Sequence, residues 1–578
     1  MTKTPTPREA FNARIAERQK GAETPVWEVG IPMRDGIELS ADVYLPLESQ
    51  RPAPAILQFT PYDKSNQVWF VPEARYYQER GYAYVIADAR GRGKSEGDWR
   101  PWVHDGRDGH DVVEWIAEQA WCTGKVGTAG LSYNGWTQWA IANEHPPHLA
   151  CMISTAAAGR FMQEIPFTFG VFQLYFVWWL RGVRRRIAQA YGGRPGETVP
   201  WLEVLSRLPV GALSEFVDPS GPGWQDMMEH DRLDDFWRSL RFDGHYDGID
   251  VPCLHVNGWY DVEDLLGGMH HYEQMVRDSP AASRQRLIVG PWSHVNTRVP
   301  HSSYGGLDFG PEGAIDIDAE HEAWFDHWLK GIDNGVGKLP AVEVFETGSN
   351  AWRRGPSYPR AVAEAALFLR FEEGVGRLTV GPAENDPPRS FRYDPLDPAP
   401  TLFNVEHYPL EDMPLDQTPV EARPDVLAYT SKPLDAPLTI SGWPFVDLHA
   451  STDGDDTDWH VKLTDVWPDG RSIRVASGCL RGANHRSLEE PEPLVPDQPY
   501  RFSVELNPVQ HRFLEGHRIR VTVTSSDFPW FARSMNRFGR IEDLADPRPA
   551  VNTIHHTSEL QSRLRLPVES GSIEQALG

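Results

Sequence analysis

The chain has 578 residues, a formal net charge of −26 and 40% hydrophobic residues, which is typical of a soluble globular protein and disfavours binding to nucleic acids or anionic membranes. A single hydrophobic core stops growing at about 250–300 residues, so two or three domains are expected. The polar N-terminus, the lack of a membrane-length apolar run and four cysteines without CxxC spacing predict a cytoplasmic protein with reduced thiols.

Residues 25–155 alternate predicted strands with predicted helices. The first two strands are joined by Asp35-Gly36, which is a strong signal for a hairpin turn. The next two are continuous apolar runs, as expected of strands covered on both faces. This alternation is typical of a doubly wound α/β sheet. The predicted strands cover residues 26–33, 37–45, 54–60 and 82–87, and a predicted amphipathic helix covers residues 106–119.

Residues 125–139 combine a short strand pattern, a sharp turn at Ser132 and a helix pattern. This is the context in which α/β-hydrolases expose a nucleophilic serine at the edge of the sheet. The motif departs from the usual G-x-S-x-G because Asn134 replaces the second glycine, which comes one position later as Gly135. An ordinary turn serine is the alternative interpretation of Ser132.

Residues 156–248 lose the strand alternation and become helical and aromatic, which predicts a cap inserted into the α/β domain. An insertion between strands of such a sheet covers their carboxyl ends, where the site is expected. Some aromatic side chains of this part would then line a substrate pocket, although packing within the cap is the alternative role. The candidate pocket residues are Trp136, Phe172, Phe176 and Trp179.

Two further strand patterns, at residues 251–256 and 286–289, belong to a second part of the core over residues 249–336. Each runs into a glycine-bearing turn with an ionisable residue, Asp261 in one and His294 in the other. Serine, acid and histidine in this chain order match the triad of α/β-hydrolases. Asp261 as a helix N-cap, Glu263 or Asp264 as the acid, and His294 as a loop residue remain the alternatives.

An oxyanion hole needs two hydrogen-bond donors. The backbone N–H of Tyr133, directly after the candidate nucleophile, supplies one. The loop after the strand at residues 54–60 has no glycine run to present backbone amides, but the phenol O–H of Tyr62 in this loop is a suitable donor. The alternative is that Tyr62 is a packed core residue.

Residues 337–578 show short runs with alternating polarity between turns rich in proline and glycine, which predicts an all-β sandwich or jelly roll. The proline-rich residues 381–401 are interpreted as a surface connection. No metal site is predicted, because the histidines lack ligand spacing. The acidic residues between Asp453 and Asp458 are interpreted as a solvated turn, with calcium binding left open.

Several motifs together resemble the cocaine esterase and X-prolyl dipeptidyl-peptidase group of serine hydrolases, to which glutaryl acylases and α-amino-acid ester hydrolases also belong. They are FTPYDK, ADARGRGKSEG, GLSYNG, GWYD, GPWSH and WFDHWLKG, in that order. The resemblance implies Ser132 as nucleophile, Asp261 as orienting acid, His294 as base, and Tyr62 with Tyr133 as oxyanion donors. It also implies an α/β-hydrolase core, a helical cap and a C-terminal jelly roll.

The expected function is hydrolysis of an ester or amide bond of a small acyl substrate through an acyl-enzyme, without a cofactor. An acylase or aminopeptidase is the alternative within this class of enzymes. A non-catalytic carbohydrate-binding protein is the alternative outside it. The sequence leaves open the substrate and whether the chain forms a homo-oligomer.

Overall fold

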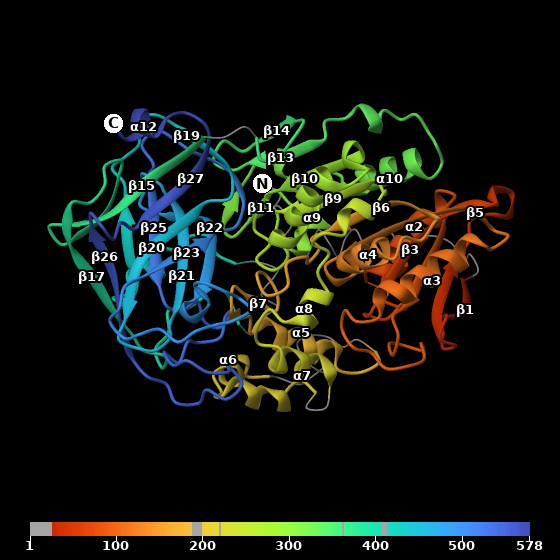
Figure 1. The fold of residues 1–578 in the computed structure, drawn as a ribbon. Coiled ribbons are helices and arrows are strands. Elements are labelled where there is room, and N and C mark those ends of the chain that lie inside the picture. The colour runs from red at the N-terminus through yellow and green to blue at the C-terminus, as the bar shows by residue number, and fades with distance from the viewer. Residues whose placement is uncertain (1–25, 67, 188–198, 219–220, 361–362, 406–412) are drawn as a thin grey trace.

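The computed structural model describes residues 26–66, 68–187, 199–218, 221–360, 363–405 and 413–578. The chain folds into an α/β-hydrolase core with an inserted helical cap and a C-terminal β-domain (Figure 1). In Figure 1 the β-domain lies on the left, the core on the right, and the cap helices below both. The fold class expected from the sequence is therefore confirmed.

The core is built on a ten-stranded sheet of order β1-β2-β4-β3-β5-β6-β9-β10-β13-β14. Strands β3 to β6, β9, β10 and β13 are parallel to their neighbours among these, whereas β1, β2 and β14 pair antiparallel. The continuous apolar runs form β3 and β4, which are buried at every position. The strands are β1 (Val26–Pro32), β2 (Glu38–Tyr44), β3 (Ala53–Thr60), β4 (Ala83–Asp88), β5 (Cys122–Leu131), β6 (Leu149–Thr155), β9 (Cys253–Gly258), β10 (Gln285–Gly290), β13 (Val342–Glu346) and β14 (Ala351–Gly355).

Helices cover both faces of this sheet. The helices α3 (Asp105–Ala117) and α4 (Tyr133–Asn143) pack in one hydrophobic cluster, and α2 (Phe70–Glu79) and α10 (Ile317–Trp328) pack in another cluster on the opposite face. The helix α9 (Leu265–Asp278) packs on β9 and β10. In a parallel sheet covered in this way, the binding site is expected at the edge formed by the carboxyl ends of the strands.

The cap is made of short elements that share one hydrophobic cluster with the core. The apolar pattern of residues 165–180 predicts a buried or lid helix, but in the structure this run is divided between a small hairpin and the start of α5. Among the described residues, no helix has the length and apolar character needed to cross a membrane. The cap elements are β7 (Phe167–Thr168), β8 (Val171–Phe172), α5 (Tyr175–Val183), α6 (Trp201–Leu205), α7 (Pro222–Glu229) and α8 (Asp235–Ser239).

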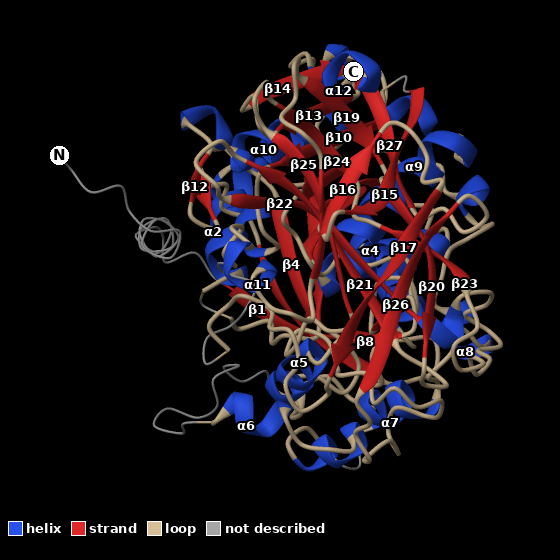
Figure 2. Cartoon of the chain, turned by 90° about the vertical axis from the view of Figure 1, so that its left-hand side faces the viewer, coloured by secondary structure: helices blue, strands red, loops and turns tan. Residues whose placement is uncertain are grey.

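The β-domain has its own core between the layers of a 13-stranded sheet, which faces the viewer in Figure 2. In β16, β26 and β27, buried side chains alternate with more exposed ones, as the sequence pattern predicts, whereas β21 is buried throughout. The strands are β15 (Ala363–Glu372), β16 (Val375–Thr379), β17 (Asn385–Tyr393), β18 (Leu427–Thr430), β19 (Leu438–Gly442), β20 (Phe445–Thr452), β21 (Asp458–Val466), β22 (Ser472–Arg481), β23 (Tyr500–Glu505), β24 (Val509–Phe513), β25 (Arg518–Thr524), β26 (Ala550–Thr557) and β27 (Arg563–Ser570), with the helices α11 (Thr418–Glu421) and α12 (Ile573–Leu577).

Three expectations from the sequence need correction. Residues 381–401 are not only a surface connection, because β17 pairs with β26 and its two prolines fall where the register shifts. The predicted core boundary at residue 336 lies before β13 and β14, which continue the core sheet. The acidic turn is not simply solvated, since Asp456 and Asp458 are buried and Asp456 pairs with Arg481 at 2.7 Å.

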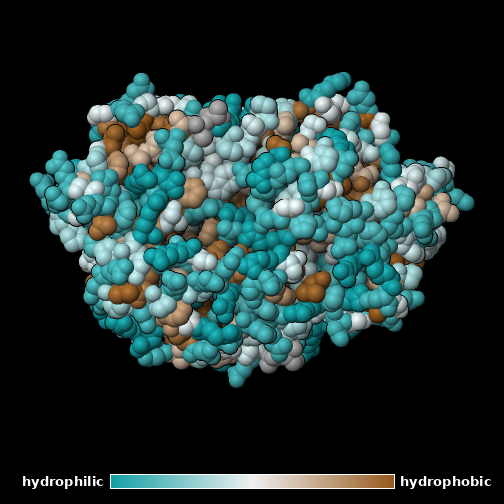
Figure 3. All heavy atoms as spheres, viewed as in Figure 1, coloured by the Kyte–Doolittle hydropathy of each residue, from teal (hydrophilic) through white to brown (hydrophobic). Residues whose placement is uncertain are grey.

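The face of the molecule in Figure 3 is dominated by hydrophilic residues, with hydrophobic ones in small scattered groups. Large apolar side chains gather inside instead, and the twelve largest fully buried side chains include six tryptophans. Many of the tryptophans therefore pack in the interior of the core, the cap and the β-domain, whereas Trp27 is exposed.

Candidate active site

Ser132 lies in the sharp turn between β5 and α4, and its backbone has φ of 64° and ψ of −126°. A positive φ strains a residue with a side chain, and such strain is common at functional positions. The two glycines of the motif are required because backbone atoms of other residues lie too close to where a Cβ would be. A Cβ on Gly130 would collide with the backbone of Asn134, and a Cβ on Gly135 would lie 2.7 Å from the carbonyl oxygen of Thr155. The spacing Gly-x-Ser-x-x-Gly is thus what this turn requires.

Asp261 follows β9 and His294 follows β10, and the structure brings the two side chains together. His294 Nδ1 lies 3.0 Å from Asp261 Oδ2, and both residues are buried. Asp261 Oδ1 accepts hydrogen bonds from the backbone N–H of Glu263 and of Asp264 at 2.9 and 3.1 Å, which fixes the carboxylate. Asp264 is farther from Nδ1, at 3.9 Å, so Asp261 has the better geometry for an orienting acid.

Ser132 and His294 are not joined by a hydrogen bond among those of the described residues. The hydroxyl of Ser132 interacts instead with the carboxyl group of Asp264, which is itself beside His294. Hydrogen bonds between a nucleophile and its base are often long before substrate binds and tighten in the complex. The three candidate residues therefore lie in one buried site with the serine side chain turned toward an acid.

The candidate oxyanion donors lie next to each other, with the rings of Tyr62 and Tyr133 6.2 Å apart. Tyr133 is the first residue of α4, where a backbone N–H has no partner within the helix. Its phenol is anchored by a hydrogen bond of 2.8 Å to Asp105. The phenol oxygen of Tyr62 accepts a bond of 3.0 Å from the indole N–H of Trp179, so the Tyr62 hydrogen points elsewhere.

Three buried carboxyl groups, Glu164, Glu263 and Asp264, form an acidic cluster beside His294. Glu263 Oε2 lies 3.7 Å from His294 Nε2, the ring nitrogen that Asp261 does not contact. The residues of the cluster are at most 7% exposed. One oxygen each of Glu263 and Asp264 is buried and makes no hydrogen bond within the described part of the chain. Buried, incompletely paired carboxylates are unusual unless a ligand completes the site.

Glu164 is held by backbone N–H groups at the start of the cap and of α9. It accepts hydrogen bonds from Gly159 and Arg160 at 3.0 and 3.2 Å, and another from Gly267. No sequence pattern points to Glu164 as a site residue, because only the folded cap brings it beside α9. The sequence pattern offers Glu263 and Asp264 only as alternative acids, whereas the structure places Glu263 beside Nε2 of His294 and Asp264 on the side of Nδ1.

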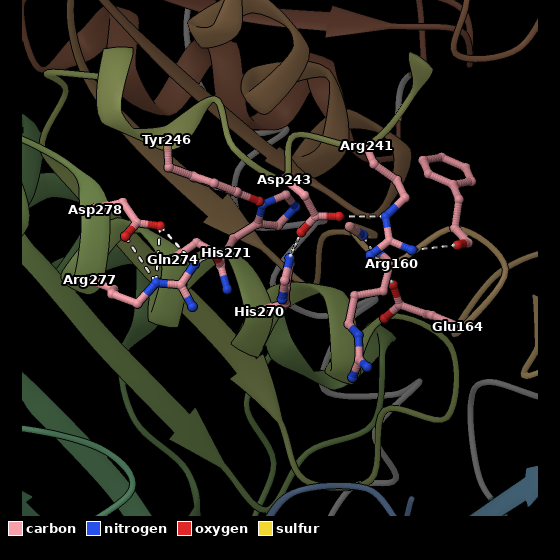
Figure 4. A network of polar contacts seen from close by, with 12 residues as sticks. Arg160, Glu164, Arg241, Asp243, Tyr246, His270, His271, Gln274, Arg277 and Asp278 are labelled. Carbon is pink, nitrogen blue, oxygen red and sulfur yellow. Dashed lines mark hydrogen bonds and ion pairs between the residues drawn. The ribbon is translucent and has the colours of Figure 1, made fainter. Parts of the chain in front are cut away.

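A network of polar contacts fixes α9 on its outer side (Figure 4). The hydroxyl of Tyr246 and Nδ1 of His271 are 2.8 Å apart, and Asp243 is 2.8 Å from His270 Nε2. Figure 4 also shows Glu164 beside Arg160, near the end of this network. Because α9 begins directly after Asp264, the network helps to hold the acidic cluster in place.

The electrostatics of the site are dominated by burial and by like charges. Burial raises the pKa of Glu263 to about 7, although the charge of His294 opposes it. Burial, together with the charges of Glu263 and Glu164, raises the pKa of Asp264 well above its usual range. Burial alone would lower the pKa of His294, but the charges of Asp261 and Glu263 raise it to about 9. A cation bound beside these carboxyl groups would therefore stabilise their charged forms.

Glu263, Asp264 and His294 also offer ligand atoms within 4.8 Å of one another, as in a metal site. A metal on His294 would occupy Nε2, since Nδ1 is bonded to Asp261. That nitrogen is the one a serine nucleophile needs. An ammonium group satisfies the carboxylates by hydrogen bonds and leaves the imidazole able to act.

The four candidate pocket residues are all buried. Trp179 contacts Tyr62 through the hydrogen bond described above. Trp136 packs edge-on against the candidate donor residue Tyr133. Phe176 packs edge-on against Trp179 and therefore reaches Tyr62 only through that tryptophan. Phe172 instead packs against Phe167 and Trp224 within the cap.

Comparison with known proteins identifies two family models along the chain. The model described as X-Pro dipeptidyl-peptidase (S15 family) matches residues 35–296, and the model of the X-Pro dipeptidyl-peptidase C-terminal non-catalytic domain matches residues 334–565. A cocaine esterase from Rhodococcus sp. is 31% identical over 93% of this chain and 98% of its own.

Two of the solved structures that resemble this chain cover most of its length. An α-amino acid ester hydrolase has a TM-score of 0.85 and 28% identity, covering 94% of this chain and 96% of its own. An aminopeptidase from a marine sediment Thaumarchaeota archaeon has a TM-score of 0.83 and 26% identity over the same shares.

Proposed function

This chain belongs to the family of serine hydrolases that includes cocaine esterase and the S15 X-Pro dipeptidyl-peptidases, and from that membership we propose that it hydrolyses ester or amide bonds of acyl groups that carry a free α-amino group. The observation that carries this proposal is the acidic cluster of Glu164, Glu263 and Asp264 beside His294. An α-ammonium group is a small cation bonded one carbon from the carbonyl carbon under attack. Carboxylates next to the base are therefore where such a group needs its partners.

The proposed chemistry uses the triad and the two tyrosines. His294 Nε2 takes the proton from Ser132 as Oγ bonds to the carbonyl carbon, and Asp261 stabilises the resulting imidazolium. The hydroxyl of Tyr62 and the N–H of Tyr133 donate to the oxyanion. His294 then protonates the leaving group, and the carbonyl bond to that group breaks to give an acyl-enzyme. Water activated by His294 releases the acid and restores Ser132.

The relatives are consistent with this substrate class. The names of the α-amino acid ester hydrolase and the aminopeptidase refer to acyl groups that bear an amine. A cocaine esterase, in contrast, is named for a substrate of another kind. The acidic cluster favours the first kind, because burying carboxylates beside a pocket for a neutral acyl group would only cost desolvation energy.

The proposal is tested with the p-nitrobenzyl ester of L-alanine and its N-acetyl twin. A charged hydrogen bond contributes about 1.5–3 kcal/mol, so the free amine is expected to raise kcat/KM by about 10- to 100-fold. Glu263→Gln is expected to remove most of this preference. Glu273→Gln, which removes a carboxyl group of the following helix α9 outside the acidic cluster, serves as the matched control. Equal hydrolysis of the two esters by the unchanged protein would contradict the proposal.

The nucleophile is tested separately. Ser132→Ala is expected to abolish hydrolysis of both esters while its circular dichroism spectrum is unchanged. A fluorophosphonate probe is expected to label the unchanged protein and not this variant. A protein that is never labelled would favour the non-catalytic binding function instead.

A further inference from the structure

A small cavity lies between the turn that bears Asp261 and the β-domain. Its volume is about 50 Å³. Glu164 and Glu263 of the acidic cluster line one side, and Lys462 and Arg474 of the β-domain line the other. Since Glu263 also lies 3.7 Å from His294 Nε2, the cavity begins directly beside the candidate base.

The β-domain presents a row of three side chains, His460, Lys462 and Arg474, to this cavity, and the last two carry its positive charge, because burial lowers the pKa of His460 to about 4. His460 and Lys462 alternate along β21 with Val461, which faces the sandwich core. Arg474 on the neighbouring strand β22 pairs in register with Thr464, two residues beyond Lys462, and so lies on the same face. β22 also contacts both strands of the cap hairpin, β7 and β8.

The charges in this row are not balanced within the β-domain. Lys462 is paired with Asp527 at 3.1 Å and with the side-chain oxygen of Gln417 at 3.0 Å. Arg474 is only 8% exposed, yet its guanidinium takes part in no ion pair and donates no hydrogen bond among the described residues. Nε2 of His460 is likewise buried without a hydrogen bond there.

A buried guanidinium without a partner is unfavourable, because an ion loses its hydration on burial. Arg474 is the residue type best suited to hold a carboxylate, since its planar fork donates two parallel hydrogen bonds. Asp527 pairs with Lys462 and is also acted on by the charge of Arg474, but one carboxylate balances only one of these two cations, so one positive charge is left for a ligand. The missing partner is therefore an anion that enters the cavity.

We propose that this cavity binds a side-chain carboxylate of the acyl group, so that the preferred substrates are α-esters or α-amides of acidic α-amino acids. This inference rests on the proposed function, because the α-ammonium of the same acyl group would contact Glu164 and Glu263 at the other side. A cavity of about 150 Å³ holds benzene, so about 50 Å³ suits a short acidic side chain rather than a ring.

The test compares p-nitrobenzyl α-esters of aspartate and glutamate with those of asparagine and glutamine. The amides have the same shape without the charge. The acidic esters are expected to have kcat/KM values about 10- to 100-fold above their amide twins, as for one charged hydrogen-bonded contact. Arg474→Gln is expected to remove this ratio while hydrolysis of the amide twins persists. An unchanged ratio in Arg474→Gln would overturn the proposal.

Two variants separate charge from folding. Arg474→Lys keeps the charge without the fork and is expected to keep part of the acidic preference. Arg471→Gln removes a solvent-exposed arginine that pairs with Asp469, directly before β22, and is expected to leave the ratio unchanged. A preference lost equally in Arg471→Gln and Arg474→Gln would reflect overall charge and would also overturn the proposal.

A last measurement is independent of the α-amino group. Glutarate carries carboxylates and no ammonium, and its inhibition of p-nitrophenyl acetate hydrolysis is measured in the unchanged protein and in Arg474→Gln. Inhibition at least tenfold weaker in the variant supports the carboxylate site even if N-acetyl esters prove to be equally good substrates. Equal inhibition overturns the site and leaves the proposed α-amino preference to its own test.

Discussion

His294 has three acids, Asp261, Glu263 and Asp264, within 3.9 Å of its ring nitrogens, and their negative charges are unfavourable for a general base. Asp261 orients Nδ1, whereas Glu263 approaches Nε2 at 3.7 Å. Their charges raise the pKa of His294 to about 9 against the effect of burial. A protonated imidazole cannot accept the serine proton, so the acids suppress the base until a cation neutralises them. A bound α-ammonium group would provide that cation and lower the pKa again.

This coupling predicts different pH profiles for the two kinds of ester. The neutral imidazole is the active form, so activity is lost as pH falls through the pKa of His294. With the N-acetyl ester of alanine, kcat is expected to rise up to about pH 9. With the free-amine ester, the same acidic limb of kcat is expected at least one pH unit lower. Identical acidic limbs, measured under saturating substrate, would show that no ammonium reaches the cluster.

Tyr62 is predicted to act through its hydroxyl alone. Tyr62→Phe is expected to lower kcat by about 10²–10³, as for loss of one oxyanion donor, with a smaller change in KM. Tyr84→Phe is the matched control, because it also removes a buried phenol, one that bonds to Gln58 inside the core. If the kcat of Tyr62→Phe equals that of Tyr84→Phe, the role of Tyr62 is packing and not oxyanion binding.

Among the secondary-structure elements, sequence periodicity predicted those whose position depends on local sequence alone. The predicted strands at residues 54–60 and 82–87 and the helix at residues 106–119 correspond to β3, β4 and α3. Asp261 and His294 could be proposed because parallel strands end at one edge of the sheet. Strand β17 was missed because two adjacent prolines read as a connection, whereas the register shift accommodates them.

Glu164 and Arg474 could not be proposed from their surroundings in the sequence. Glu164 reaches the site from the cap, and the backbone N–H groups of Gly159 and Gly267 position its carboxylate. Gly267 is more than a hundred residues away from Glu164 in the sequence. Arg474 reaches the cavity from the β-domain, where it alternates like any strand residue. Both depend on contacts between separate parts of the chain, which periodicity does not encode.

At the scale of the whole molecule, the site depends on how the β-domain is held against the core. Arg160 is 2.5 Å from Glu505 at the end of β23, and both side chains are largely buried. The same Arg160 donates its backbone N–H to Glu164. One residue thus connects the β-domain, which bears Arg474, to the acidic cluster, so the ion pair helps to set the distance between the two sides of the cavity.

This ion pair is predicted to stabilise the assembled molecule through coupling of its two partners. Arg160→Met and Glu505→Gln are each expected to speed thermal inactivation, because each leaves a buried charge unpaired. The double variant is expected to inactivate about fivefold more slowly than the product of the single effects predicts, which corresponds to about 1 kcal/mol of coupling. Inactivation rates are the appropriate measure, since a chain of several domains does not unfold in one step.

Arg238 and Glu489 form an exposed ion pair between α8 and the β-domain and serve as the control. Their double-mutant cycle is expected to show little coupling because water screens the pair. Equal coupling in both cycles would mean that burial adds nothing to the contact between the domains.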